Sequence, residues 1–276
     1  MVISELIEHK KDILSLLDKK LNNDFKLIDK NSDKKKNTSL LNKIIKKYKD
    51  DLFKSFEDLN KKLIIEYCCS VKILEYRDLI WSYDTISLTR RIGELWQQYC
   101  SLCWTFSRKE NLTRIKPPSF FSILENANKK WKINKEDFNQ ITNLIGEINM
   151  IEDETFVLNK VPYVVDFKSG FGSNEKGNTM RLFGVGRAYK LWNEKTELLI
   201  LVKQNELNNN YLKILTNSNL WKVYMGVNAY KKIDQITGSS TFDLSKNIYN
   251  FEKDFNSKTL EKFSKMVENY KTYLTW

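Results

Sequence analysis

The chain has 276 residues, of which 41% are hydrophobic and 13% aromatic, so it can bury a large core and is not a disordered polypeptide. Its apolar runs are too short to span a bilayer, and residues 1–20 mix charges into apolar spacing as an amphipathic helix does, not a secretory signal. We therefore expect a cytoplasmic protein with no membrane partner. The formal net charge of +11 favours a polyanionic partner such as DNA, although surplus lysine is also typical of solvated surface.

The cysteines and the single histidine exclude several kinds of site. Cys100 and Cys103 form a CxxC pair, but the adjacent Cys68 and Cys69 have the wrong spacing to complete a zinc site, so we expect all four thiols to pack in the core. His9 is the only histidine and lies in a predicted N-terminal helix. This excludes histidine-centred nuclease sites, a Ser-His-Asp triad and a zinc deaminase site.

The first half of the chain is predicted to be mostly helical. Apolar residues recur at helical spacing over residues 3–17 and again over 41–63, which we interpret as one long helix after a lysine-rich loop at 31–39. Further helices are expected over 88–104 and around 121–150. We predict that residues 1–80 form a helical region for DNA binding or dimerisation.

A sheet is predicted to follow. The runs ETFVLN and PYVVDFK are β-branched and aromatic and are separated by a tight connection, which predicts a β-hairpin over residues 154–168. The later elements are expected to be a helix marked by 185–192, strands at 197–203 and 220–226, a short helix ending near Gly238 and a helix over 260–274. The fold class is therefore α/β (α+β), with a mixed central sheet flanked by helices, and residues 81–276 form the second domain.

The end of the hairpin carries an acid and a lysine on one face. Residues two apart in a strand project to the same side, so Asp166 and Lys168 lie together, with Val165 and Phe167 on the other side. Charged groups at the end of an otherwise buried strand cost desolvation, which is tolerated most readily where chemistry needs them. The alternative is a simple ion pair at the surface.

A second acid follows from the hairpin geometry. A turn centred on Asn159 and Lys160 places Asp153 directly opposite Asp166. Two carboxylates beside a lysine are suited to hold Mg²⁺ against a phosphodiester oxygen and to activate a water molecule. If the turn falls elsewhere, the facing position belongs to another residue of this stretch: Glu147, Asn149 or Glu152.

Asp153 followed by Asp166-Phe167-Lys168 resembles the PD-(D/E)xK signature of the nuclease superfamily that includes many type II restriction endonucleases. The likeness covers about residues 86–205, and Glu152 stands where the family usually has proline. The resemblance implies a restriction-endonuclease-like core: a helix, a three-stranded meander bearing the motif, a helix and another strand. It also implies that Asp153 and Asp166 bind Mg²⁺ and that Lys168 orients or activates water.

The family often has a further glutamate on the helix before the meander, and Glu94 is the matching residue. The resemblance implies that Glu94 assists catalysis through a metal ion or its water shell. The ordinary alternative is that Glu94 is the helical i, i+4 partner of Arg90.

A glycine-rich, polar stretch follows the motif and is expected to meet DNA phosphates or base edges. It resembles a phosphate-binding P-loop only loosely, because Asn178 occupies the essential lysine position, so we expect no nucleotide cofactor. The candidate DNA-binding residues are Ser169, Ser173, Asn174, Lys176, Asn178, Arg181 and Arg187.

The expected function is that of a bacterial or archaeal type II restriction enzyme, which cuts double-stranded DNA at a short site as a homodimer and leaves 5′-phosphate and 3′-hydroxyl ends. The nearest alternative is a structure-specific or repair nuclease of the same superfamily. The alternative from another class is a non-catalytic DNA-binding protein in which the lysines only bind phosphate.

Overall fold

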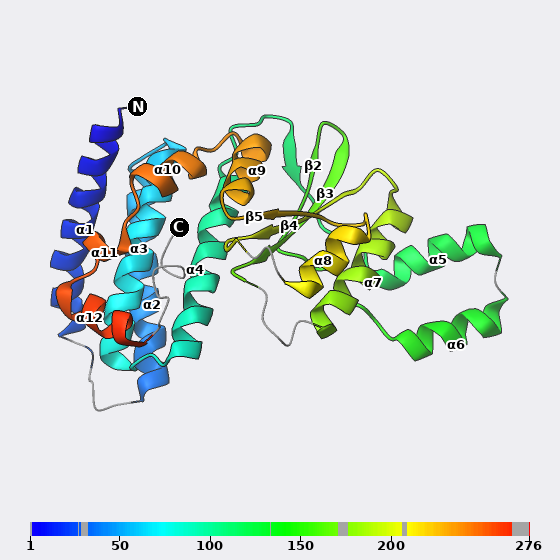
Figure 1. The fold of residues 1–276 in the computed structure, drawn as a ribbon, viewed down its shortest axis with the longest axis horizontal. Helices are drawn as coiled ribbons and strands as arrows, with labels where there is room; N and C mark the ends of the chain where they lie inside the picture. Colours follow the sequence, from blue (N-terminus) through cyan, green and yellow to red (C-terminus); the bar gives the residue numbers. More distant parts are fainter. Residues whose placement is uncertain are drawn as a thin grey trace. The chain divides into compact units, whose positions relative to one another are not determined.

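The computed structural model describes residues 2–26, 28, 33–132, 134–170, 176–205, 209–266 and 276. The chain divides into a helical unit, Met1–Arg108 with Ile233–Trp276, and a sheet unit, Lys109–Lys232 (Figure 1). The division differs from the predicted one at residue 80, because the helical region extends to Arg108 and the chain returns to it near its end. Within the described residues, no helix has the length and apolar character needed to cross a membrane.

The helical unit takes its helices from both ends of the sequence. They are α1 (Ile3–Phe25), α2 (Lys34–Lys54), α3 (Leu59–Ile80), α4 (Thr85–Thr105), α10 (Thr241–Asn247), α11 (Phe251–Asp254) and α12 (Ser257–Met266). At its centre, α3 is buried at every residue from 63 to 76, because most of this stretch is apolar and its charged side chains form ion pairs, Glu66 with Lys49 and Lys72 with Glu75. All four cysteines are free and buried, as predicted.

The predicted long helix over 41–63 is wrong, because two helices share its apolar stripe. The first, α2, ends at Lys54, and α3 begins at Leu59. Asp58 causes the new start, since its side chain accepts a hydrogen bond from the backbone N–H of Lys61 at 3.0 Å and caps α3. The stretch 121–150 likewise contains two helices, α5 (Phe120–Trp131) and α6 (Lys135–Ile145).

Buried polar contacts hold the C-terminal segment on the N-terminal helices. Lys10 Nζ and Tyr67 Oη each lie 2.8 Å from a carboxylate oxygen of Asp254. Glu75, which is also buried, accepts a hydrogen bond from the backbone N–H of Asn256 at 2.6 Å. These contacts join residues more than 180 positions apart in sequence, which is why composition alone could not place the C-terminal segment in this unit.

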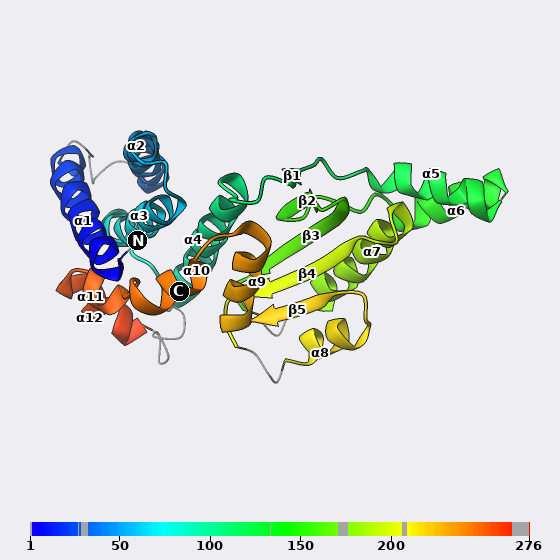
Figure 2. The same ribbon diagram turned by 90° about the horizontal axis from the view of Figure 1, so that it is seen from above.

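The sheet unit is built on five strands in the order β1-β2-β3-β4-β5 (Figure 2). They are β1 (Leu112–Arg114), β2 (Glu154–Leu158), β3 (Val161–Lys168), β4 (Glu197–Val202) and β5 (Lys222–Met225). The pairs β1–β2 and β2–β3 are antiparallel, whereas β3–β4 and β4–β5 are parallel. The parallel connections run through α7 (Lys176–Trp192) and α8 (Asn210–Asn217), and α9 (Val227–Thr237) crosses the boundary between the units.

The predicted hairpin and its register are confirmed. Asn159 and Lys160 form the turn with φ angles of 51° and 64°, the left-handed pair that a tight two-residue hairpin connection requires. Thr155 consequently pairs with Val164, and Glu154 pairs with Val165. Continuing this register by one position places Asp153 opposite Asp166, as predicted.

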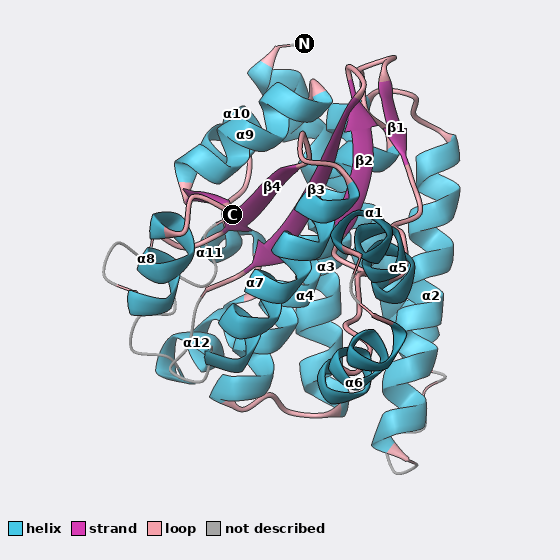
Figure 3. Ribbon diagram, turned by 90° about the vertical axis from the view of Figure 1, so that its right-hand side faces the viewer, coloured by secondary structure: helices cyan, strands magenta, loops and turns pink. Residues whose placement is uncertain are grey.

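One face of the sheet packs against α7, which runs along it (Figure 3). Val164, Leu198 and Ile200 on the strands share a buried cluster with Leu182 and Val185 of α7. Helices α5 and α6, which are inserted between β1 and β2, extend away from the sheet (Figure 1). The structure therefore confirms a mixed sheet flanked by helices, together with a helical N-terminal region.

Candidate active site at the end of the β2–β3 hairpin

Asp166 and Lys168 lie on the face of β3 that α7 covers, since they alternate with the other face and share a side with the core residue Val164. The Asp166 side chain is buried and Lys168 is one-fifth exposed. Lys168 Nζ lies 2.9 Å from one carboxylate oxygen of Asp166 and 3.0 Å from the other. The Asp166–Lys168 pair is therefore largely buried at the end of β3 and is not an exposed surface ion pair.

Asp153 lies immediately before β2 and is fixed by the neighbouring strand. Its Oδ2 accepts a hydrogen bond of 2.6 Å from the backbone N–H of Phe167, the residue between Asp166 and Lys168. The other predicted occupants of this position lie elsewhere: Glu147 and Asn149 are exposed, upstream in the chain. The geometry therefore favours Asp153 as the partner of Asp166.

Glu152 is a third acid of this cluster, and it binds Arg181 of α7. The two nitrogens of Arg181 lie 2.6 and 3.0 Å from the two carboxylate oxygens of Glu152, and one of them lies 3.8 Å from Asp166. A second contact from the same helix supports the segment, because Tyr189 Oη donates to the carbonyl oxygen of Met150 at 2.6 Å. Helix α7 therefore holds in place the segment from Met150 to Glu152, which directly precedes Asp153.

The acids perturb one another's protonation. Burial raises the pKa of Glu152 to about 7, and the charge of Asp166 also raises it, against the hydrogen bonds from Arg181. Burial and then the charge of Asp166 raise the pKa of Asp153 to about 6, opposed by the Phe167 N–H. Three carboxylates thus face only two cations, Lys168 and Arg181, which leaves a surplus of negative charge.

This donor set fits Mg²⁺ as a site with few protein ligands. Among the described residues, no three or more histidine, cysteine, aspartate or glutamate side chains group as metal ligands. Mg²⁺ does not require such a group, because it keeps several waters and is commonly held by one or two carboxylates together with substrate phosphate. Asp153 and Asp166 would be those two ligands.

Glu94 lies in the helical unit, on α4, and its contacts match the ordinary alternative. Arg90 Nε donates to Glu94 Oε1 at 2.9 Å, the i, i+4 pair, and Arg91 Nη1 donates to Oε2 at 3.0 Å. Both carboxylate oxygens are therefore used by arginines of the same helix, which lowers the pKa of Glu94. Its catalytic role, expected from the family resemblance, stays a prediction.

Some of the candidate DNA-binding residues are exposed, whereas others already bind residues of the protein itself. Lys176 and Arg187 are exposed on α7, and Ser169 is partly buried just after β3. Arg181 is engaged with Glu152, and it also reaches Asn178. It therefore supports the acid cluster rather than presenting a free guanidinium. Two further candidates, Ser173 and Asn174, lie outside the described residues.

Sequence reasoning missed the Glu152–Arg181 pair. The sequence indicates Glu152 only as an alternative to Asp153, and Arg181 only as a DNA contact. One available signal is the acidic pair Glu152-Asp153 directly before a predicted strand, since a buried acid such as Glu152 requires a cation nearby. The partner itself is 29 residues away, on a helix whose rotation about its axis the sequence does not specify.

The sheet unit has a groove of about 790 Å³ whose lining ends, in sequence, at the residue before Glu152. It is formed by the segment after β1 and the segment before Glu152, and its lining includes Lys116, Phe120, Asn149 and Ile151. Ile151 is 72% exposed although it is large and apolar, and it stands immediately before the acid pair. The carboxylates of the acid cluster themselves are not part of the lining of this groove.

No protein-family model, curated protein or solved structure matches the chain, so its own geometry defines the candidate site.

Proposed function

We propose that this chain is a Mg²⁺-dependent endonuclease that hydrolyses phosphodiester bonds of double-stranded DNA at a specific site, as type II restriction enzymes do, leaving 5′-phosphate and 3′-hydroxyl ends. One observation carries the proposal. The hairpin register, continued one position beyond Glu154, places Asp153 opposite Asp166. Asp153 accepts a hydrogen bond from the Phe167 N–H, and Lys168 lies 2.9 Å from Asp166. This combination supplies the acids and the amine that such a hydrolysis uses.

The order of elements supports the proposal. Three antiparallel strands, β1 to β3, are followed by α7 and by β4, which is parallel to β3. This is the order that the resemblance to the PD-(D/E)xK superfamily implies. The pair α5 and α6 lies between the first two strands as an addition to that core.

Each residue of the cluster has a distinct part in the proposed reaction. When bound, Mg²⁺ lowers the pKa of its water and stabilises the negative charge that develops on the phosphate. Asp153 and Asp166 would hold the ion at the strand end, and Lys168, already 2.9 Å from Asp166, would orient the attacking water. The Phe167 N–H fixes the Asp153 carboxylate, so the two acids keep their separation.

The net charge of +11 supports a polyanionic substrate, and Lys176 and Arg187 are exposed on the helix that follows the motif. We expect a homodimer, because two copies related by twofold symmetry present one active site to each strand of a palindromic site.

The test is incubation of the purified protein with unmethylated phage DNA, with and without Mg²⁺, beside Lys168→Ala and Lys160→Asn. Lys160 is an exposed lysine at the turn of the same hairpin, and asparagine tolerates its left-handed backbone. We expect discrete Mg²⁺-dependent fragments from the wild type and from Lys160→Asn, and none from Lys168→Ala. Cleavage that follows junctions or ends instead of a sequence would indicate the structure-specific nuclease.

A non-catalytic DNA-binding protein is the second candidate, and one observation favours it. Lys168 and Arg181 already neutralise Asp166 and Glu152 within the cluster, as in a purely structural ion-pair network. This function predicts that Asp166→Ala binds DNA as the wild type does and that several large genomic DNAs stay intact in every condition.

A further inference from the structure

The helical unit contains a small polar cavity of about 320 Å³. It lies between α2, α3 and α4 and is lined by Asn42, Arg77, Ser87, Arg90, Arg91 and Glu94. At about 30 Å³ for each molecule, this volume is room for roughly ten waters, or for a phosphate group and some of its hydration. The lining carries three positive charges against one negative charge.

Arginine is scarce in this chain, which makes the grouping distinctive. The seven arginines are Arg77, Arg90, Arg91, Arg108, Arg114, Arg181 and Arg187. Three of these pair with a carboxylate that no other arginine contacts: Arg108 with Asp58, Arg114 with Glu154 and Arg181 with Glu152. In the cavity, by contrast, three arginines are grouped around one carboxylate, that of Glu94.

Contacts within the protein orient the three arginines but do not occupy all of their N–H donors. The Glu94 carboxylate lies 2.9 Å from one nitrogen of Arg90 and 3.0 Å from one nitrogen of Arg91. Arg91 Nε is buried and has no hydrogen-bond partner among the described residues. The guanidinium of Arg77 stacks on the ring of Tyr83 at 4.2 Å and forms no ion pair in the described part of the chain. Stacking fixes its plane, one donor lies close to the Tyr83 hydroxyl, and the other N–H donors are left for a ligand.

One neutral side chain, Asn42, adds hydrogen-bonding capacity, whereas the Ser87 hydroxyl already accepts from the Asp84 N–H and donates to the Asp84 carbonyl oxygen. The Oδ1 of Asn42 is buried and lacks a partner among the described residues. The oxygen and nitrogen of an asparagine amide are exchangeable by rotation, so Asn42 can present its N–H₂ group to an anion instead. Ser87 lies in the first turn of α4, while Asp84 beside it uses its carboxylate to cap that helix through the Ser87 N–H at 2.7 Å.

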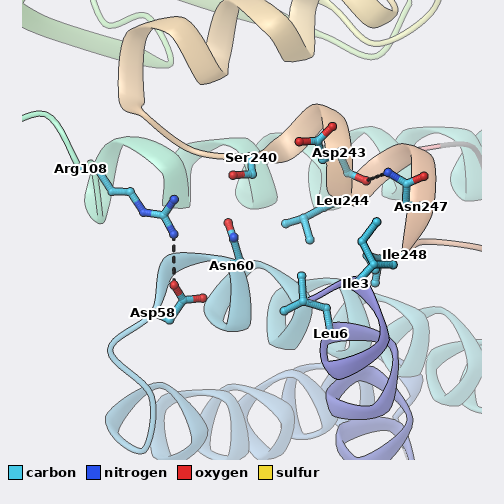
Figure 4. Close-up of a pocket in the computed structure, with 10 residues that line it drawn as sticks. All are labelled: Ile3, Leu6, Asp58, Asn60, Arg108, Ser240, Asp243, Leu244, Asn247 and Ile248. Carbon is cyan, nitrogen blue, oxygen red and sulfur yellow. Dashed lines mark hydrogen bonds and ion pairs between the residues drawn. The ribbon is translucent and has the colours of Figure 1, made fainter. Parts of the chain in front are cut away.

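A larger cavity of the same unit shows the contrast. The cavity of about 500 Å³ in Figure 4 has a single arginine, Arg108, which lies 3.1 Å from a carboxylate oxygen of Asp58. Asp243 adds another carboxylate, and Leu6 and Ile248 provide apolar surface. The lining of that cavity has one more negative than positive charge, whereas the arginine-lined cavity has an excess of guanidinium groups.

We propose that the cavity between α2, α3 and α4 is a phosphate-binding site in which Arg77, Arg90 and Arg91 are the ligands. The planar guanidinium matches the oxygens of a phosphate by paired hydrogen bonds, and its charge is permanent. Glu94 is the internal counterion that orders Arg90 and Arg91 and that a phosphate displaces. The phosphate belongs to DNA or to a free phosphate compound, and the two sources share this chemistry. The site shares no residue with Asp153, Asp166 and Lys168, and it gives Glu94 a role other than the catalytic one that the family resemblance implies.

The first test is calorimetric titration of the full chain with inorganic phosphate, using chloride at equal ionic strength as the reference. We expect wild-type protein to bind and Arg77→Gln/Arg90→Gln/Arg91→Gln to bind at least tenfold more weakly, since charge-assisted hydrogen bonds are lost. The matched control is Lys43→Gln/Lys46→Gln/Lys47→Gln, which removes the same charge from exposed positions of α2. Absence of wild-type binding, or equal weakening in the control, would overturn the site.

Glu94→Gln gives a second test, whose expected result is a gain. Freeing Arg90 and Arg91 from their carboxylate should tighten phosphate binding roughly twofold to fivefold, the range for releasing a partly exposed ion pair. A loss of folding in the triple-arginine variant therefore does not remove the test. Unchanged or weaker phosphate binding by a folded Glu94→Gln protein contradicts the proposal.

Titration of a labelled DNA duplex over a series of salt concentrations distinguishes DNA from a free phosphate compound as the source of the phosphate. If DNA supplies it, the triple-arginine variant loses affinity and its dependence of log K on log salt becomes shallower by about one unit per lost phosphate contact. If a free phosphate compound supplies it, inorganic phosphate binding is lost while DNA binding equals that of the lysine control. Both results support the site and assign its source.

Discussion

Arg181 of α7 binds both carboxylate oxygens of Glu152, with nitrogen-to-oxygen distances of 2.6 and 3.0 Å. The Glu152 side chain is only 2% exposed, so without this partner its charge would be buried uncompensated. Because Asp153 follows Glu152 directly, the pair fixes the chain at the position from which Asp153 meets β3. A structural contact thus determines the geometry of the proposed metal ligands.

Arg181→Gln should destabilise the protein, because it removes the cation that neutralises Glu152. Losing one partner of a buried ion pair costs about 3–5 kcal/mol, and we expect roughly 2–3 kcal/mol because Arg181 is one-third exposed. Urea unfolding followed by circular dichroism measures the change. Arg187→Gln, on the exposed side of the same helix, is the control and should stay within about 0.5 kcal/mol of wild type. Similar values for the two variants would contradict the pair's role.

Mg²⁺ should raise the melting temperature, and the rise should be larger at pH 8 than at pH 5.5. The pKa values of Glu152 and Asp153 are raised to about 7 and about 6, so both acids are charged at pH 8 and the cation relieves their repulsion, whereas at pH 5.5 protons compete with it. At a concentration one hundred times Kd, the stabilisation is about 2.7 kcal/mol. Differential scanning calorimetry with EDTA as the reference measures it, and Asp166→Asn should show no rise at either pH.

The hairpin was predictable from the sequence because its determinants are local. Asn159 and Lys160 adopt the left-handed backbone of a tight turn, and the turn fixes which residues face each other along β2 and β3. The pairing of Asp153 with Asp166 follows from that register. Two-residue alternation in β3 then places Lys168 beside Asp166, which the structure shows at 2.9 Å, and Asp153 accepts a hydrogen bond from the N–H of Phe167, the residue between them.

Other parts of the fold depend on contacts between residues that are far apart in sequence. Strand β1 has only three residues, Leu112–Arg114, and exists because it pairs with β2 more than forty residues later, so no periodicity marks it. The rotation of α7, which brings Arg181 to Glu152, depends on packing against the sheet. The C-terminal segment joins the helical unit through single buried contacts such as that of Lys10 with Asp254. Sequence spacing does not encode any of these.

The substitution of glycine by alanine should have opposite effects at two positions of α7. A Cβ at Gly186 would lie 2.7 Å from Nε1 of the buried Trp221, whose N–H donates to the Leu182 carbonyl oxygen at 2.8 Å. Gly186→Ala should therefore cost about 1–3 kcal/mol through overpacking. Gly177→Ala meets nothing within 4 Å and should gain up to about 1 kcal/mol from helix propensity. Chemical denaturation of both variants tests the sign, and a stable Gly186→Ala protein would contradict the close approach.

His9 should contribute a loss of stability between pH 7.5 and pH 5.5, while Glu152 and Asp153, whose pKa values are raised, contribute a gain over the same interval. Burial and then the charge of Lys61 lower its pKa below the ordinary value, so the folded state favours the neutral ring, which packs edge-to-face on Phe56 at 4.8 Å. The stabilisation is complete above about pH 6.5, where the unfolded histidine is also neutral, and declines below it as the unfolded chain takes up the proton first. The change in stability over this interval should be more favourable for His9→Gln than for wild type, as measured by urea midpoints at the two pH values. Other groups that titrate there, including Glu152 and Asp153, are present in both proteins, so the difference isolates His9, and an equal change would show that its pKa is not lowered.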